Sequence, residues 1–207
     1  MTADFFISAL VTMLVIVDPL GIVPIFVSLT AGLPIAARRQ VAVRASVIAF
    51  AILCGATLIG SWLLDKLGIG MPAFRIAGGL LLFSIASEMV FGVRIVRKSH
   101  EVEAALDEHV RNIAAFPLAI PLMAGPGAIT AAILLAGRAG DDAIRLGSLI
   151  GVIAIVVVSC LLAFLVGARL AKLLGVTGNV VLERLLGVIL AALAVQFVID
   201  GVRAAWT

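Results

Sequence analysis

The sequence predicts an all-α polytopic membrane protein whose six transmembrane helices form two inverted three-helix repeats. Three observations support this prediction. Hydrophobic residues make up 63% of the 207 residues, against roughly 45–50% in ordinary globular domains. Charged residues contribute only 13%, and the mean hydropathy is +1.28. Similar apolar segments also recur in the two halves at a nearly constant spacing. We therefore expect a single transmembrane domain over residues 1–207.

The lengths of the apolar segments give the number of spans. A bilayer core about 30 Å thick is crossed by about 20 apolar residues in a helix. Segments of that length predict six spans, at residues 5–30, 42–64, 71–92, 113–136, 144–167 and 182–203. The first apolar segment has no basic stretch before it, so we expect a helix of the mature protein and no cleaved signal.

The distribution of Lys and Arg predicts the orientation. Ten of these residues fall in the connections after the first, third and fifth spans, and five fall on the opposite side, which carries both termini. The positive-inside rule places the richer side in the cytoplasm. We therefore expect a multi-pass protein of the bacterial inner membrane, with both termini extracytoplasmic and a charged cytoplasmic segment at residues 93–112.

The two halves of the chain resemble each other. Residues 75–92 read RIAGGLLLFSIASEMVFG and residues 184–201 read RLLGVILAALAVQFVIDG, so that an Arg and two Gly coincide at an offset of 109. The segments DPLGIVPIFVSLTAG and GPGAITAAILLAG correspond at an offset of 107. We predict one repeat over residues 1–98 and a second over residues 110–207. Because each contains three spans, an odd number, the second is inverted relative to the first, as in many secondary transporters.

Two of the predicted spans contain residues that interrupt a helix. Proline lacks the N–H that a helix interior needs and clashes with the preceding turn. Pro19 and Pro24 therefore predict a break in the first span, with Asp18 as the N-cap of the helix that follows. In the fourth span Gly125 and Pro126 repeat this pattern, with glycine at the N-cap, and Pro117 and Pro121 interrupt the helix further upstream.

Paired breaks at membrane depth predict a binding site. Broken backbone is tolerated there only where it is buried in protein or lines a wet cavity. The free N–H groups of a half-helix suit an anion, whereas Asp18 suits a cation, and a zwitterionic amino acid carries both charges. The predicted substrate-binding residues are Asp18, Pro19, Gly21, Pro24, Ser28, Pro121, Gly125, Pro126, Gly127 and Thr130. The alternative is that the prolines only kink their helices and that backbone donors satisfy Asp18.

Asp18 and Glu88 are the candidates for coupling to an ion or proton. A carboxylate inside the bilayer costs roughly 2.5–3.5 kcal/mol on insertion scales, so such residues are usually functional. For Glu88 the alternative is that its side chain reaches cytoplasmic water near the end of its span. The spacing of the two cysteines and two histidines matches no metal site, and we expect no metal or cofactor.

Three motifs resemble the MarC (UPF0056) family of integral membrane proteins. They are DPLGIVPIFVSLTAG at 18–32, SEMVFG at 87–92 and FPLAIPLMAGPGAIT at 116–130, and the resemblance covers essentially the whole chain. The family often carries Asn at the positions of Asp18 and Ile22. The resemblance implies a six-helix transporter related to the LysE-type amino acid exporters. Some members of the family look like proton-coupled carriers of small neutral amino acids such as glycine and alanine.

These observations favour a secondary transporter of small neutral amino acids that works by alternating access. The expected partners are this small-molecule substrate, membrane lipids and, optionally, further copies of the chain. An exporter of another metabolite and an accessory subunit without its own substrate remain as alternatives. An enzyme is not expected, because the predicted spans contain no histidine and no convergent acids. A nucleic-acid partner is not expected either, because no basic face is predicted.

Overall fold

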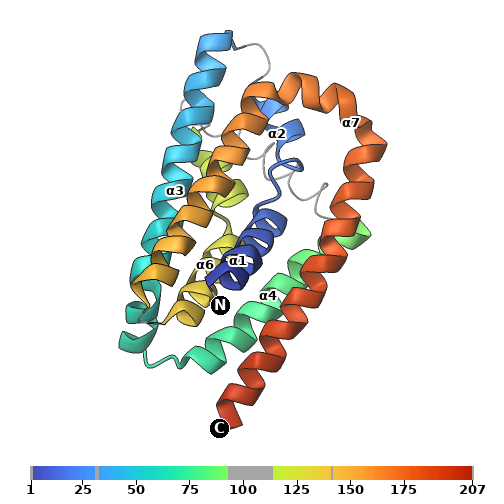
Figure 1. Cartoon of the computed structure of the whole chain (residues 1–207). Coiled ribbons are helices and arrows are strands. Elements are labelled where there is room, and N and C mark those ends of the chain that lie inside the picture. Colours follow the sequence, from blue (N-terminus) through green and yellow to red (C-terminus); the bar gives the residue numbers. More distant parts are fainter. Residues whose placement is uncertain (1, 31–32, 93–113, 141, 207) are drawn as a thin grey trace.

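The computed structural model describes residues 2–30, 33–92, 114–140 and 142–206 (Figure 1). These residues form six α-helices and one π-helical segment, and none of them lies in a β-strand. The elements are α1 (Thr2–Val17), α2 (Val23–Leu29), α3 (Ile35–Lys66), α4 (Met71–Phe91), η1 (Ala114–Met123), α6 (Pro126–Ala139) and α7 (Ala143–Trp206). The all-α prediction is confirmed for this part of the chain.

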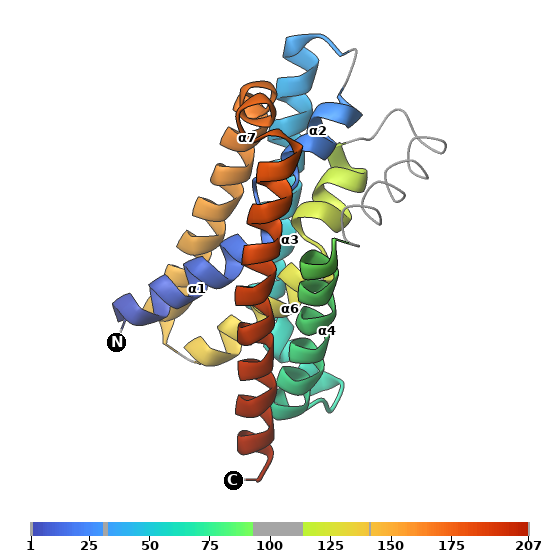
Figure 2. The same ribbon diagram turned by 90° about the vertical axis from the view of Figure 1, so that its right-hand side faces the viewer.

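Four helical segments are long and apolar enough to cross a membrane. They are Ile35–Lys66, Met71–Phe91, Ala143–Gly167 and Glu183–Trp206, which match the second, third, fifth and sixth predicted spans. The last two belong to α7, which turns over at one end of the bundle and returns antiparallel to itself (Figures 1 and 2). The first and fourth predicted spans are each divided, and Asp4–Val17 and Pro126–Ala139 are shorter apolar helices.

The first division lies where the prolines predict it, but Asp18 has a different role from the one expected. Its N–H donates to the carbonyl of Leu14 at 2.9 Å, so it closes the last turn of α1. Its φ of 53° is left-handed, and α2 begins only at Val23, with Ile22 at the N-cap. The N-cap prediction for Asp18 was therefore wrong. A residue before proline is disfavoured in right-handed helical conformation, which is consistent with α1 ending before Pro19.

The second division agrees with the prediction at its centre. Gly125 is the N-cap of α6, in extended conformation, and Pro126 lies in the first turn. Upstream, η1 contains Pro117 and Pro121, and its end is closed by a bond from the N–H of Ala124 to a carbonyl five residues earlier, at 2.8 Å. Proline has no N–H to donate in either kind of helix, so Pro117 and Pro121 interrupt the backbone hydrogen bonding of this segment.

Glycines bring α4 and the second half of α7 into close antiparallel contact (Figure 2). A Cβ atom added to Gly79 would lie 2.7 Å from the carbonyl oxygen of Ala194. One added to Gly187 would lie 2.9 Å from the Cβ of Met89, and Gly201 is as tightly placed against the first turn of α4. Small residues of this kind allow membrane helices to pack backbone to backbone.

Candidate functional site

The Asp18 carboxylate is buried at the division between α1 and α2. Only 2% of the residue is exposed, and its Oδ1 accepts a hydrogen bond from the N–H of Gly21 at 3.1 Å. Its Oδ2 is also buried and has no hydrogen-bond partner among the described residues. A buried carboxylate oxygen without a partner is unfavourable, so the free acceptor is suited to a proton or to a donor on a ligand.

Gly21 gives the Asp18 side chain its place. A Cβ atom added to Gly21 would overlap Asp18 Oδ2 and lie 2.7 Å from Asp18 Cγ. The φ of Gly21 is not left-handed, so space and not backbone conformation requires glycine here. The carboxylate folds back over its own turn because this position has no side chain.

A cavity of about 350 Å³ adjoins this turn. Residues of α1, the α1–α2 connection and both halves of α7 line it: Leu14, Val15, Asp18, Pro19, Leu20, Ser159, Ala163 and Leu186. Asp18 and Ser159 are the only polar side chains among these lining residues. The volume is at the lower end of the range of small-molecule sites, and mostly apolar walls with a few polar groups are typical of such sites.

The second division lies next to the first but does not line this cavity. A Cβ atom added to Gly127 would lie 3.6 Å from Cγ2 of Ile16, two residues before Asp18. Gly125 and Gly127 are buried, whereas Pro126 is exposed. The structure therefore brings the start of α6 against the end of α1, so the two helix breaks lie next to each other.

The remaining predicted site residues lie elsewhere. Thr130 is buried, with its methyl group against Gly78 of α4. Pro24 and Ser28 are exposed on α2, and Glu88 is half-buried in the last turn of α4. The side chain of Pro121 lies outside the described residues.

The sequence analysis missed a polar cluster between α6 and α7. Arg138 and Asp200 form an ion pair of 2.6 Å, and the Gln196 amide donates to the other carboxylate oxygen at 2.7 Å. The Arg138 guanidinium also lies 4.5 Å from the centre of the Phe197 ring. Opposite charges just after the fourth predicted span and inside the sixth were the available signal. Glu183, only 4% exposed, is a second buried carboxylate that was not singled out.

We expect the Arg138–Asp200 pair to stabilise the contact between α6 and α7. Because each side chain is 29% exposed, a coupling energy of about 1 kcal/mol is expected. A double-mutant cycle of Arg138→Met and Asp200→Asn, read from unfolding in mixed detergent micelles, measures it. Additive single effects would show that the pair contributes nothing to stability.

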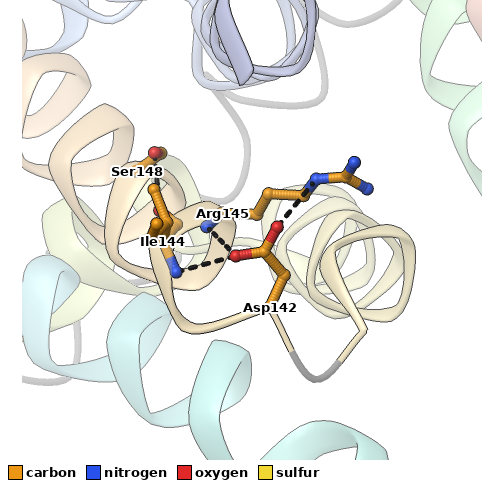
Figure 3. Close-up of polar contacts among 4 residues, drawn as sticks. All are labelled: Asp142, Ile144, Arg145 and Ser148. Carbon is orange, nitrogen blue, oxygen red and sulfur yellow. Dashed lines mark hydrogen bonds and ion pairs between the residues drawn. The ribbon is translucent and has the colours of Figure 1, made fainter. Parts of the chain in front are cut away.

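Asp142 has a structural role at the start of α7. Its Oδ1 accepts from the N–H groups of Ile144 and Arg145 at 2.9 and 3.2 Å, while its Oδ2 pairs with the Arg145 side chain at 3.2 Å (Figure 3). This is a typical N-cap arrangement, and it fixes the start of α7.

Metal binding has no support in the described ranges. No group of three or more His, Cys, Asp or Glu in them is placed to hold a metal ion. Both histidines belong to residues 93–113, which the structure does not describe.

The chain matches known proteins over nearly its whole length. The model of the MarC family of integral membrane proteins matches residues 3–206. A UPF0056 membrane protein of Archaeoglobus fulgidus is 39% identical over 200 residues, covering 96% of this chain and 92% of the relative. A UPF0056 membrane protein of Aquifex aeolicus is 38% identical, covering 96% and 92%, and YhcE of Escherichia coli is 34% identical, covering 91% and 87%. No solved structure matches the chain. The protein thus belongs to the MarC family of integral membrane proteins.

Proposed function

We propose that this protein is a secondary transporter of small neutral amino acids that works by alternating access between two inverted three-helix halves. The observation that carries the proposal is the Asp18 carboxylate, buried at a helix break with one oxygen unpartnered, beside a cavity of about 350 Å³. Ionisable groups buried in membrane helices commonly mark substrate and ion pathways.

The order of elements supports the inverted repeat. Within the proposal, the divided segments α1–α2 and η1–α6 are the first span of each half. Helices α3 and α4 then correspond to the two halves of α7, which gives six spans in all. Each half therefore begins with a broken helix and continues with two long ones.

The glycine contacts between α4 and α7 support the same relation. An offset of 109 relates Gly78 to Gly187 and Met89 to Val198. In the structure Gly187 packs against Met89, and Gly79, the neighbour of Gly78, packs against Val198. The Gly187–Met89 contact therefore has a counterpart in the Gly79–Val198 contact, displaced by one residue from the position that the offset predicts. Such paired contacts are expected for two helices related by a pseudo-two-fold axis.

The charges at the two breaks support a zwitterionic substrate. The free Oδ2 of Asp18 would accept hydrogen bonds from the substrate ammonium group. The first turn of α6 presents N–H groups at its Gly125 N-cap, which has no side-chain cap, and these would bind the substrate carboxylate. The α6 residues do not line the cavity described above. The substrate would therefore reach the α6 N–H donors only after the two halves move relative to each other.

Asp18 would also couple transport to a proton. Protonation of Oδ2 satisfies the buried acceptor when no substrate is bound, and the ammonium group satisfies it when substrate is bound. Glu88 would be a second site on the proton path. With the charge-rich side in the cytoplasm, the protein would lie in the inner membrane with both termini outside.

Uptake by purified protein in liposomes tests the proposal. Labelled glycine and alanine are added with and without an inward proton gradient, and uptake is expected to depend on the gradient. Asp18→Asn should lose the gradient dependence together with part of the uptake, because Asp18 both couples the proton and binds the substrate ammonium group. Loss of the gradient dependence alone would make Asp18 the coupling residue only. Gly125→Leu, with its folding verified by thermal melting, should lose uptake. Absence of uptake of either amino acid by folded protein would exclude this substrate class and favour an exporter of another metabolite or an accessory subunit.

A further inference from the structure

A second cavity, of about 270 Å³, lies where α2, the start of α3 and the middle of α7 meet. Its lining combines two arginines with mainly apolar side chains: Phe26, Val27, Thr30, Ile35, Arg38, Arg39, Phe164 and Leu165. No acidic side chain is among these lining residues. The cavity shares no lining residue with the one beside Asp18 and plays no part in the function proposed above.

The polar part of this cavity is cationic. Arg38 donates through Nε to the carbonyl of Leu33 at 3.1 Å, which orients its guanidinium group. Neither Arg38 nor Arg39 forms an ion pair with a described acidic residue. Helix α3 also begins here, at the Pro34 N-cap, without a side-chain cap for its first N–H groups. Two guanidinium groups and an uncapped helix start all favour an anion.

The remaining part is apolar and extends to the protein surface. The rings of Phe26 and Phe164 are stacked, with centroids 4.4 Å apart. Leu165 and Ile35 are exposed at the edge of the cavity, Ile35 at 86%. Phosphate alone would leave Ile35 and Leu165 uncovered, whereas an anion joined to a hydrocarbon chain would cover them.

The length of α3 places the arginines at the depth of the headgroups. At 1.5 Å per residue, its 32 residues measure about 48 Å, well beyond a hydrocarbon core of about 30 Å. Arg38 and Arg39 lie in its first turns, just before the predicted span at 42–64. Basic pockets between helices at this depth are suited to anionic lipid headgroups.

We propose that this cavity binds an anionic phospholipid. The phosphate lies between Arg38 and Arg39 at the start of α3, and an acyl chain lies against the exposed Ile35 and Leu165, beside the buried Phe26–Phe164 pair. The bound lipid would tie α2, which follows the Asp18 break directly, to α3 and α7.

Native mass spectrometry of the intact protein in detergent, titrated with phosphatidylglycerol or phosphatidylcholine, tests this proposal. Phosphatidylglycerol should bind at least about tenfold more tightly, since each arginine near the headgroups contributes on the order of fivefold. Arg39→Gln, at an exposed position, should weaken this binding about threefold to tenfold, and adding Arg38→Gln should weaken it further. Arg44→Gln is the matched control, because it removes the same charge from an exposed position of α3 outside the cavity.

Three results would overturn the proposal. They are equal binding of the two lipids, equal effects of Arg39→Gln and Arg44→Gln, and displacement of phosphatidylglycerol by inorganic phosphate alone. The last would identify a site for free phosphate. The double variant Arg38→Lys/Arg39→Lys keeps both charges and should retain most of the phosphatidylglycerol binding. This result would verify that lost charge, and not lost folding, weakens binding in the glutamine variants.

Discussion

Replacing Gly21 with alanine should lower amino acid uptake about tenfold to a hundredfold while leaving the protein folded. The new Cβ would take the space of Asp18 Oδ2, so the carboxylate would have to leave its hydrogen bond with the Gly21 N–H. Losing a hydrogen bond to a charged group costs about 1.5–3 kcal/mol, which corresponds to this range of affinity. Initial uptake rates in liposomes, together with thermal melting, measure the two effects.

Gly70→Ala is the matched control for this experiment. Gly70 also lies in a connection and has a φ of −66°, and an added Cβ would meet only ordinary contact, 3.6 Å from Pro72. In an Asp18→Gly background, Gly21→Ala should cost no stability, because the Asp18 side-chain atoms that the new Cβ would overlap are gone. Glycine at position 18 also tolerates the φ of 53° found there. Normal uptake by Gly21→Ala would show that the position of the Asp18 carboxylate does not matter for transport.

Replacing Gly79 with alanine should destabilise the protein by about 1–3 kcal/mol, and Gly79→Leu should prevent folding. The Cβ would lie 2.7 Å from both the Ala194 carbonyl oxygen and Cγ2 of Val198. The first of these is backbone of α7, so relief requires separation of two helices. Unfolding in mixed detergent micelles, followed by circular dichroism, measures the change.

Gly151→Ala is the control for the α4–α7 contact. It lies in the first half of α7, and an added Cβ would meet nothing within 4 Å. Both substitutions gain the same helix propensity of about 1 kcal/mol, so their difference isolates packing. Equal stability of the two variants would mean that α4 and α7 do not pack as closely as the structure has them.

The sequence predicted the features that depend on local chemistry. The helical class and four long spans follow from composition and segment length, and the division at Gly125–Pro126 follows from the missing proline N–H. The same reasoning failed at Asp18. An Asp-Pro pair is compatible both with a helix start and with a left-handed helix end, and the surrounding turn selects the second.

The features that depend on tertiary contact could not be predicted. Ser159 and Leu186 line one cavity with Asp18 because α7 doubles back. The sequence predicted two spans in this region but not which of their residues would lie beside the α1–α2 connection. The Arg138–Asp200 pair joins residues that are 62 positions apart. Gly21 was predicted as a substrate-binding residue, whereas in the structure it leaves the space that the Asp18 side chain occupies.

Accessibility of the cavity beside Asp18 from the two sides of the membrane tests the central claim most directly. Ser159→Cys would be introduced after replacement of the native Cys54 and Cys160, and impermeant thiol reagents applied from either side of proteoliposomes. We predict that the Ser159→Cys thiol reacts from both sides. We also predict that free alanine, added as the substrate, slows both reactions. Reaction from one side alone, or at rates that alanine does not change, would contradict alternating access at this cavity.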